Sequence, residues 1–120
     1  MSREQMDFLG QVLMSGVRDQ SISFWDKLIE GKMRGSMSKK ISESYSTEQL
    51  EILTDIISQV VDTTLHNLLW TIEQEDQIHL KVQLDEDAID IKEASDGLAG
   101  ELYTEDGWII KYSEKRYIEP

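Results

Sequence analysis

The sequence predicts a single α+β domain, in which N-terminal helices and a long central helix pack on a C-terminal antiparallel β-meander of about four strands. Three observations lead to this fold class. Apolar residues recur at helical spacing from about residue 47 to 72, residues 78–84 alternate strictly, and turn signals separate the short apolar runs that follow. A chain of 120 residues is near the commonest length for one domain, so the domain spans residues 1–120.

The N-terminal part predicts two helices. Ser2 followed by Gln5 has the spacing of a capping box, which favours a helix beginning at Ser2. A second, shorter helix is expected from Ser23 to Glu30, with Gly31 as its stop signal. Residues 32–46 are rich in serine and basic side chains, and we expect them to form a long loop. The apolar stripe of the first helix consists of Met6, Leu9, Val12, Leu13 and Val17.

The helix expected from Thr47 to Ile72 is the strongest signal in the chain, and Ser46 with Gln49 again has capping-box spacing. Its apolar arc is too wide for one neighbour to bury, so we expect the N-terminal helices on one side and a sheet on the other. The arc comprises Leu50, Leu53, Ile57, Val60, Val61, Thr64, Leu65, Leu68 and Ile72, flanked by Ile52, Ile56 and Trp70. The polar stripe left for solvent comprises Glu51, Asp55, Ser58, Gln59, Asp62, His66 and Glu73.

The C-terminal part predicts the strands. Residues 78–84 alternate between apolar and polar side chains, which indicates a strand with one buried face. The acidic run 85–87 is expected to turn the chain into a second strand over 88–93. Residues 98–103 and 108–112 flank a four-residue connection that ends in Gly107, which is typical of a hairpin.

Charge is distributed unevenly along the chain. The net charge is −12, yet residues 1–45 hold seven basic and six acidic side chains, while residues 46–120 hold five basic and eighteen acidic ones. Such a field attracts a basic protein partner and repels nucleic acid. The other interpretation is that the acidity only maintains solubility. There is no cysteine, no signal-peptide pattern and no apolar run that could span a bilayer, so we expect a cytoplasmic protein without a membrane partner.

No motif predicts catalysis, a metal or a cofactor. Asp62 and His66 are four residues apart on the expected central helix and could form a base or a pair of metal ligands. The alternative is an ordinary ion pair on a solvated stripe. The acidic run from Asp85 lacks the glycine and the glutamate that a calcium-binding EF-hand loop requires. Phosphate-binding loops and nucleophile elbows are also missing. We therefore expect no enzyme.

Two stretches of the sequence carry a resemblance: residues 62–70, DTTLHNLLW, and residues 94–112, ASDGLAGELYTEDGWIIKY. Together they resemble small uncharacterised bacterial proteins of similar length, some of which are similar to immunity proteins of toxin systems. The resemblance covers roughly the C-terminal half of the chain. It implies a bacterial cytoplasmic protein that binds a cognate toxin, without identifying the toxin or the contact residues.

The sequence thus leaves two functions open. The first is a small acidic protein-binding domain, such as an immunity protein that neutralises a basic toxin. Its candidate partner-binding residues are Asp85, Glu86, Asp87, Tyr103, Trp108 and Tyr112. For Trp108, packing in the core is the favoured alternative. The second function is a small ligand-binding domain or enzyme with a site near Asp62 and His66.

Overall fold

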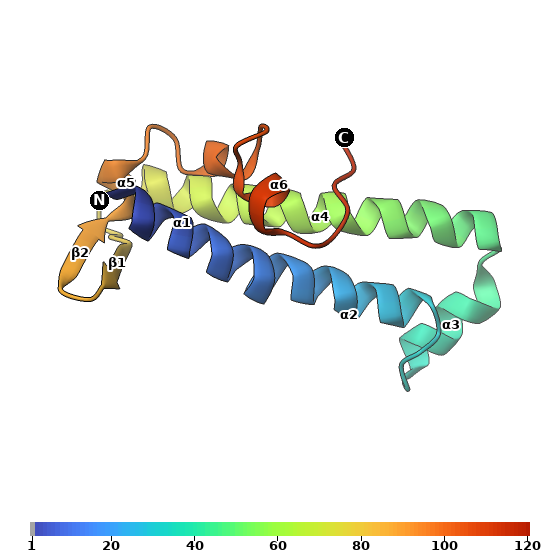
Figure 1. Cartoon of the computed structure of the whole chain (residues 1–120). Helices are drawn as coiled ribbons and strands as arrows, with labels where there is room; N and C mark the ends of the chain where they lie inside the picture. The colour runs from blue at the N-terminus through green and yellow to red at the C-terminus, as the bar shows by residue number, and fades with distance from the viewer. Residues whose placement is uncertain (1) are drawn as a thin grey trace.

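Two long antiparallel helical arms dominate the computed structural model, which describes residues 2–120 (Figure 1). The first arm consists of α1 (Ser2–Leu13), the π-helical segment η1 (Met14–Arg18) and α2 (Asp19–Ile29). The second arm is α4 (Thr47–Gln74), which packs against α2 and η1, whereas α1 contacts the β-hairpin over residues 81–90 and the C-terminal part of the chain. The molecule is elongated, with principal-axis extents of 52 × 27 × 27 Å.

The first arm is one continuous helix, so the prediction of two separate N-terminal helices was wrong. Gly16 does not end the helix, because it lies inside η1, where the chain takes one extra residue per turn. In an α-helix, two side chains four residues apart point in directions that differ by about 40° around the helix axis. The wider π turn offsets this rotation. Met14, the first residue of η1, and Ile22, which follows the segment, are therefore both fully buried. The predicted cap by the Ser2 side chain lies outside the described structure.

The predicted loop over residues 32–46 contains a helix, α3 (Ser36–Ser44). Although its sequence is polar, α3 packs against the end of α2, where the buried Ser38 hydroxyl donates to the Leu28 carbonyl oxygen over 2.8 Å. The segment still serves as the connection between the two arms, and its helix was missed because only Ser38 of its nine residues is buried.

The capping box at the start of α4 is confirmed. The Gln49 amide donates to the Ser46 hydroxyl over 3.2 Å, and the Ser46 amide donates to the Gln49 side-chain oxygen over 2.8 Å. The helix continues to Gln74, slightly beyond its predicted end. Within residues 2–120, no helix is both long and apolar enough to cross a membrane.

The predicted α+β class is correct, but the meander of about four strands is not. In the described chain the sheet has two antiparallel strands, β1 (Lys81–Leu84) and β2 (Asp87–Asp90), paired in the register Leu84↔Asp87. Asp85 turns the chain at a φ of 56°, a conformation that aspartate tolerates better than most residues. After β2, the Asp90 side chain caps the short helix α5 (Ile91–Ala94).

The two remaining predicted strands are helical turns, η2 (Ala99–Leu102) and α6 (Trp108–Tyr112). Ala99 and Leu102 are three residues apart, so one 3-10 turn places both on the same side, and both are buried. Ile109 is buried directly beside Trp108, which suits a helical turn better than an alternating strand. The tertiary structure decides between the two periodicities, because short apolar runs fit either one.

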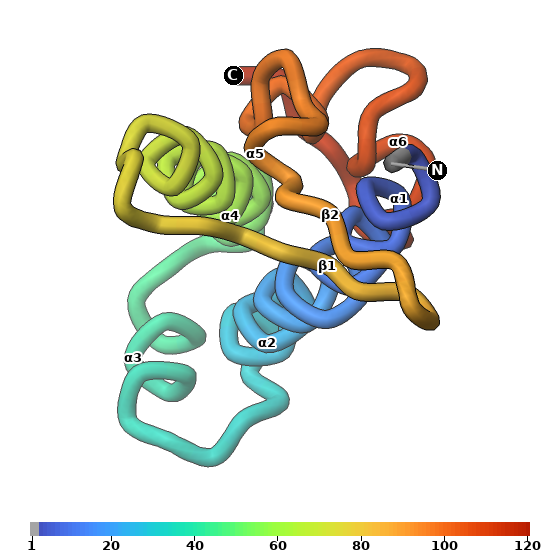
Figure 2. Tube along the Cα trace, turned by 90° about the vertical axis from the view of Figure 1, so that its left-hand side faces the viewer, coloured from blue at the N-terminus to red at the C-terminus, as the bar shows by residue number. Residues whose placement is uncertain are grey.

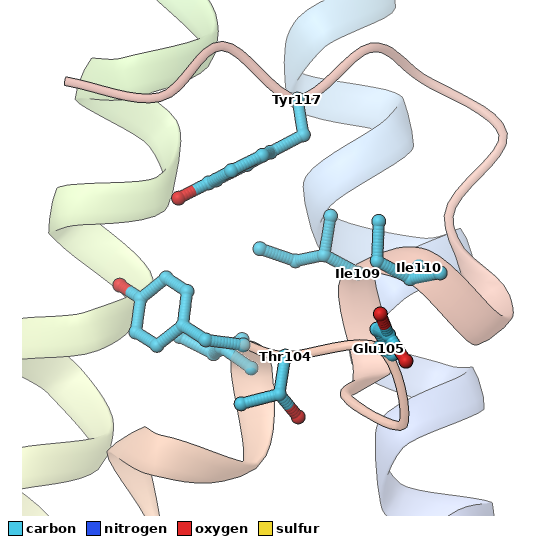
Figure 3. Close-up of a pocket in the computed structure, with 7 residues that line it drawn as sticks. Thr104, Glu105, Ile109, Ile110 and Tyr117 are labelled. Atoms are coloured by element: carbon cyan, nitrogen blue, oxygen red, sulfur yellow. The ribbon is translucent and has the colours of Figure 1, made fainter.

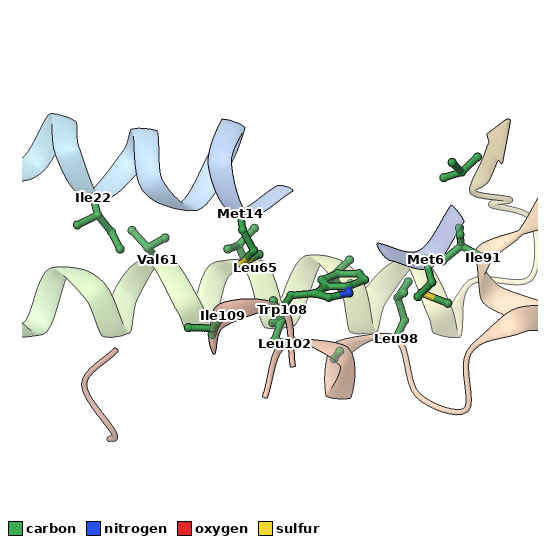
Figure 4. Packing of buried hydrophobic residues seen from close by; sticks show 13 residues of the cluster. Met6, Met14, Ile22, Val61, Leu65, Ile91, Leu98, Leu102, Trp108 and Ile109 are labelled. Atoms are coloured by element: carbon green, nitrogen blue, oxygen red, sulfur yellow. The ribbon is translucent and has the colours of Figure 1, made fainter. Parts of the chain in front are cut away.

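Residues 95–120, which we call the C-terminal segment, cover one side of the two arms (Figure 2). The core lies between this segment and the arms, with Trp108 at its centre (Figure 4). Gly10 permits the close approach, since a Cβ atom at this position would overlap the indole ring of Trp108. Around Trp108 the core contains Met6, Met14, Ile22, Val61, Leu65, Leu69, Val82, Ile91, Leu98, Ala99, Leu102 and Ile109.

The buried side of α4 differs from the predicted one. Ser58 and Asp62, assigned to the solvent-exposed stripe, are buried, whereas Val60 and Leu68 of the apolar arc are about half exposed at 52% and 51%. The reason is the C-terminal segment, which packs over the polar side of α4 and supplies hydrogen-bonding partners there. No sheet covers the other side, as the two strands contact α1 instead.

Candidate functional site

An apolar cavity of about 340 Å³ opens on the C-terminal segment. Figure 3 shows Tyr117, carried by the end of the chain, opposite Ile109 and Ile110 of α6. Ile110 is the most exposed large hydrophobic residue, at 61%, although it lies beside the core. The complete lining is Leu102, Tyr103, Thr104, Glu105, Ile109, Ile110 and Tyr117. Such a cavity has the size and lining of a site for an apolar group.

The loop between η2 and α6 shapes the floor of this cavity. Thr104 has a φ of 76°, in the left-handed region that residues other than glycine rarely adopt. The same turn brings the backbone of Gly107 so close to the Tyr103 carbonyl that a Cβ atom at Gly107 would overlap it. The turn therefore depends on Gly107, and it connects Tyr103 to α6, both of which contribute to the lining.

A buried arginine holds the end of the chain in place. The guanidinium of Arg18, which is fully buried, donates to both carboxylate oxygens of Asp62 over 2.6 and 3.0 Å. It also donates to the Ser113 hydroxyl over 2.7 Å and to the carbonyl oxygens of Lys115 and Arg116 over 3.1 and 2.8 Å. These five hydrogen bonds use all five donors of the guanidinium. Arg18 thereby fixes residues 113–116 and, next to them, Tyr117.

Two further carboxylates hold the same stretch of chain. Asp19 accepts hydrogen bonds from the Ser113 hydroxyl and from the Glu114 amide. Asp26 accepts two hydrogen bonds from Arg116, over 2.9 and 2.8 Å. The hydrogen bond with Asp26 is the main reason why the pKa of Arg116 is raised above its ordinary value. All three acidic anchors, Asp19, Asp26 and Asp62, are therefore engaged by the terminal residues or by Arg18.

The structure does not join Asp62 and His66, the pair that the sequence singled out. Both oxygens of Asp62 accept from Arg18, whereas His66 Nδ1 lies 3.1 Å from the Tyr103 hydroxyl. In residues 2–120, no hydrogen bond connects the two side chains, and no group of three His, Cys, Asp or Glu is placed to hold a metal ion. Burial raises the pKa of Tyr103 above its ordinary value, and the nearby charge of Asp62 adds to this shift.

A polar hollow adjoins the apolar cavity and shares Tyr103 and Thr104 with it. Three carboxylates and two cationic side chains, those of Arg3 and Lys111, line the hollow. Arg3 contacts Glu101 over 3.5 Å, so one of the carboxylates is already paired with a cation. The acidic side chains of the hollow are Asp96, Glu101 and Asp106. An apolar cavity beside an acidic hollow suits a ligand that carries both apolar and positively charged groups.

The predicted partner-binding residues fall in three different places. Tyr103 is half-buried and lines the apolar cavity. Trp108 is fully buried in the core, which confirms the favoured alternative and removes it as an anchor. Tyr112 is half-buried against the core. The acidic run Asp85, Glu86 and Asp87 is exposed at the tip of the β1–β2 hairpin, away from the cavity, whose lining it does not join.

Sequence reasoning missed Arg18, Ile110 and Tyr117. Arg18 gave one signal that could have been used, because it is the single basic residue in the otherwise apolar and neutral stretch 8–18. A single charge in such a stretch of a packed helix calls for an acidic partner. For Ile110 and Tyr117 no local signal exists, since their meeting depends on how the chain end is held.

Comparison with known proteins finds no family model, no curated protein and no solved structure that matches this chain.

Proposed function

We propose that this protein is a small acidic protein-binding domain that receives an apolar side chain of a basic partner in the cavity between Tyr103 and Tyr117. The observation that supports this most directly is the adjacency of an apolar cavity and an acidic hollow on one segment of the chain. Interfaces obtain most of their affinity from a few apolar or aromatic anchors in such pockets. Carboxylates beside the pocket select the charge of the partner.

The overall charge supports the same partner class. Eighteen acidic and five basic side chains in residues 46–120 produce a field that attracts a basic protein before contact. A toxin that acts on nucleic acid has a basic surface for the same electrostatic reason. Residues 62–70 and 94–112 also resemble small bacterial proteins, some of which are similar to immunity proteins. Together these observations lead us to propose an immunity role, in which the protein neutralises a basic toxin in the cytoplasm.

The test begins with the isolation of a partner from the native host by affinity capture, followed by binding kinetics. Replacing Ile110 with glutamate places a charge in the mouth of the cavity and should weaken binding by at least about tenfold, since a buried unpaired charge is costly. Val60→Glu adds the same charge on the opposite side of the arms, at a similarly exposed residue, and should leave partner binding unchanged. Equal binding by both variants would contradict the proposed site.

The ionic strength of the buffer provides a second criterion. If the acidic surface steers the partner, the association rate should fall steeply as salt increases, while the dissociation rate changes little. An acidic partner, or an association rate that does not respond to salt, would contradict the electrostatic part of the proposal.

A second candidate function is the binding of a small apolar ligand in the same cavity. Its volume of about 340 Å³ lies at the lower end of the range of small-molecule sites, about 300–1,000 Å³. The contact between the Tyr103 hydroxyl and His66 would give such a ligand polar groups near the site that the sequence suggested around Asp62 and His66. A ligand that co-purifies with the protein and is lost from Ile110→Glu would favour this function.

A further inference from the structure

Large hydrophobic side chains are exposed on the side of the arms opposite to the C-terminal segment. On the first arm, Asp19 and Asp26 contact the chain end, and Gly10 contacts Trp108. Residues two positions away from these lie about 160° around a helix, on the opposite side. Those positions include Phe8, Val12, Val17 and Phe24, which are exposed by 45%, 46%, 40% and 46%.

On α4 the same reasoning starts from Asp62, which faces Arg18 below the C-terminal segment. Val60 lies about 160° away from Asp62, and Ile56 and Leu68 each lie about 120° away. All three are exposed, by 52%, 45% and 51%. Both arms thus expose apolar side chains on the side away from the C-terminal segment. We call this side the uncharged face, and it comprises Phe8, Val12, Val17, Phe24, Ile56, Val60 and Leu68.

Charged side chains are excluded from this face. Helix α4 contains five acidic and no basic residues, and its acids are Glu48, Glu51, Asp55, Asp62 and Glu73. At about 100° per residue, all five lie within an arc of about 60° on the other side of the helix. On the first arm, residues 8–17 and 20–25 hold no charge. In a chain with 30% charged residues, such a segregation requires a reason other than solubility.

The elongated chain exposes more surface than a compact monomer of its mass. The chain exposes 8081 Å², whereas a compact monomer of 13.9 kDa exposes about 6,700 Å². The radius of gyration is 16.9 Å, compared with about 14 Å for a compact domain of 120 residues. The excess of about 1,400 Å² per chain exceeds the roughly 800 Å² that each partner buries in a standard stable interface.

We propose that a second copy of this chain covers the uncharged face and that the protein is a two-fold symmetric dimer. The net charge of −12 makes two copies repel each other, and the uncharged face is where they can meet without bringing acids together. A basic partner, by contrast, gains nothing from a face without carboxylates. This inference is independent of the proposed function, which uses the opposite side of the arms.

The two ends of the molecule carry opposite charges, which favours an antiparallel dimer. At one end, residues 31–46 around α3 hold four basic side chains and one acidic. At the other end, residues 75–93 around the β1–β2 hairpin hold seven acidic side chains and two basic. Figure 1 shows α3 and the hairpin at opposite ends of the arms, both projecting away from the C-terminal segment. Antiparallel packing brings each acidic end to the basic end of the other copy.

Sedimentation of the full chain over a dilution series tests the proposal. The wild-type protein should have twice the chain mass of 13.9 kDa, and Val60→Glu should raise the dimer dissociation constant by about a hundredfold or more. Ile110→Glu, with the same added charge on the opposite side, should remain dimeric. Circular dichroism should show the same helix content in both variants, because both residues are more than half exposed.

A charge exchange tests the antiparallel arrangement. The double variant Glu86→Lys and Asp87→Lys should weaken the dimer, because two basic ends then meet. Adding Lys39→Glu and Lys40→Glu to the same chain should restore the dimer, because each end then again meets an end of opposite charge on the other copy. A wild-type monomer at all concentrations, or a dimeric Val60→Glu variant, would overturn the proposal. So would a monomer that captures a different protein on this face. A charge exchange without effect would overturn the antiparallel arrangement.

Discussion

Arg18 shows how one residue can determine the position of a distant part of the chain. It is fully buried and satisfied by Asp62 and by three acceptors between residues 113 and 116. A buried ion pair contributes little net stability compared with an apolar pair of the same size, because both charges lose their hydration. Its value here is positional, since the same guanidinium joins both arms to the chain end that forms the cavity wall.

Replacing Arg18 should therefore lower the free energy of unfolding, and the loss should depend on whether Asp62 is present. Arg18→Met leaves the buried carboxylate of Asp62 without its cation and should lower the free energy of unfolding by about 3–5 kcal/mol. The double variant with Asp62→Leu should lose clearly less than the sum of the two single variants, because no unpaired charge remains. Urea unfolding of the three variants and the wild type measures this coupling. Additive losses would show that the two side chains do not act as a pair.

Helix α4 shows how an element can have the predicted bounds and still face the wrong way. The alternation of buried and exposed leucines on it gives a matched comparison, since Leu69 is 1% exposed and the adjacent Leu68 is 51% exposed. Both residues have the same side chain, the same helix propensity and the same neighbouring turns. Only the direction of the side chain differs.

We expect Leu69→Ala to lower the free energy of unfolding by about 2–5 kcal/mol, because it leaves a cavity in the core. Leu68→Ala should change it by less than about 1 kcal/mol, since the side chain loses little burial. The free energies of unfolding of the two alanine variants are to be compared in chains that also carry Val60→Glu, where dimer contacts no longer contribute. Equal losses at the two positions would mean that α4 is rotated relative to the structure described.

At the scale of the whole molecule, the two sides of the helical arms have different tasks. One side carries the C-terminal segment, with the core, the polar anchors and the candidate binding cavity. The other side is uncharged and free for a second copy. A dimer formed this way exposes two binding cavities pointing away from each other, so that dimerisation and partner binding do not compete for the same surface.

The chain end should be necessary for the cavity and for stability. A chain ending at Tyr112 lacks Tyr117 and removes three of the acceptors of Arg18, so it should unfold at a clearly lower temperature and lose partner binding. The dimer should persist at temperatures where the shortened chain is folded, because the uncharged face is unchanged. Thermal unfolding and sedimentation of the same sample measure both effects. An unchanged midpoint would contradict the anchoring role of Arg18.

Local signals were sufficient for several elements of this protein. The capping box at Ser46 and Gln49 located the start of α4, because it depends only on residues close in sequence. The alternation over residues 78–84 predicted β1 and its buried Val82 for the same reason. The width of the apolar arc on α4, by contrast, wrongly predicted a second neighbour for the arc, because Val60 and Leu68 remain about half exposed. The sequence by itself thus determined the α+β class, the long helix α4 and the β1–β2 hairpin.

Tertiary contacts decided the rest. Leu98, Leu102 and Trp108 fit a strand or a helical turn equally well over so few residues, and packing against the arms selected the helical turns. The direction of α4 followed from tertiary contacts: Arg18 pairs with Asp62 under the C-terminal segment, whereas Leu68 remains about half exposed. The cavity of Tyr103, Ile110 and Tyr117 exists only because this arginine, far away in sequence, holds the chain end. Such long-range hydrogen bonds leave no periodic pattern in the sequence, so only the folded structure shows them.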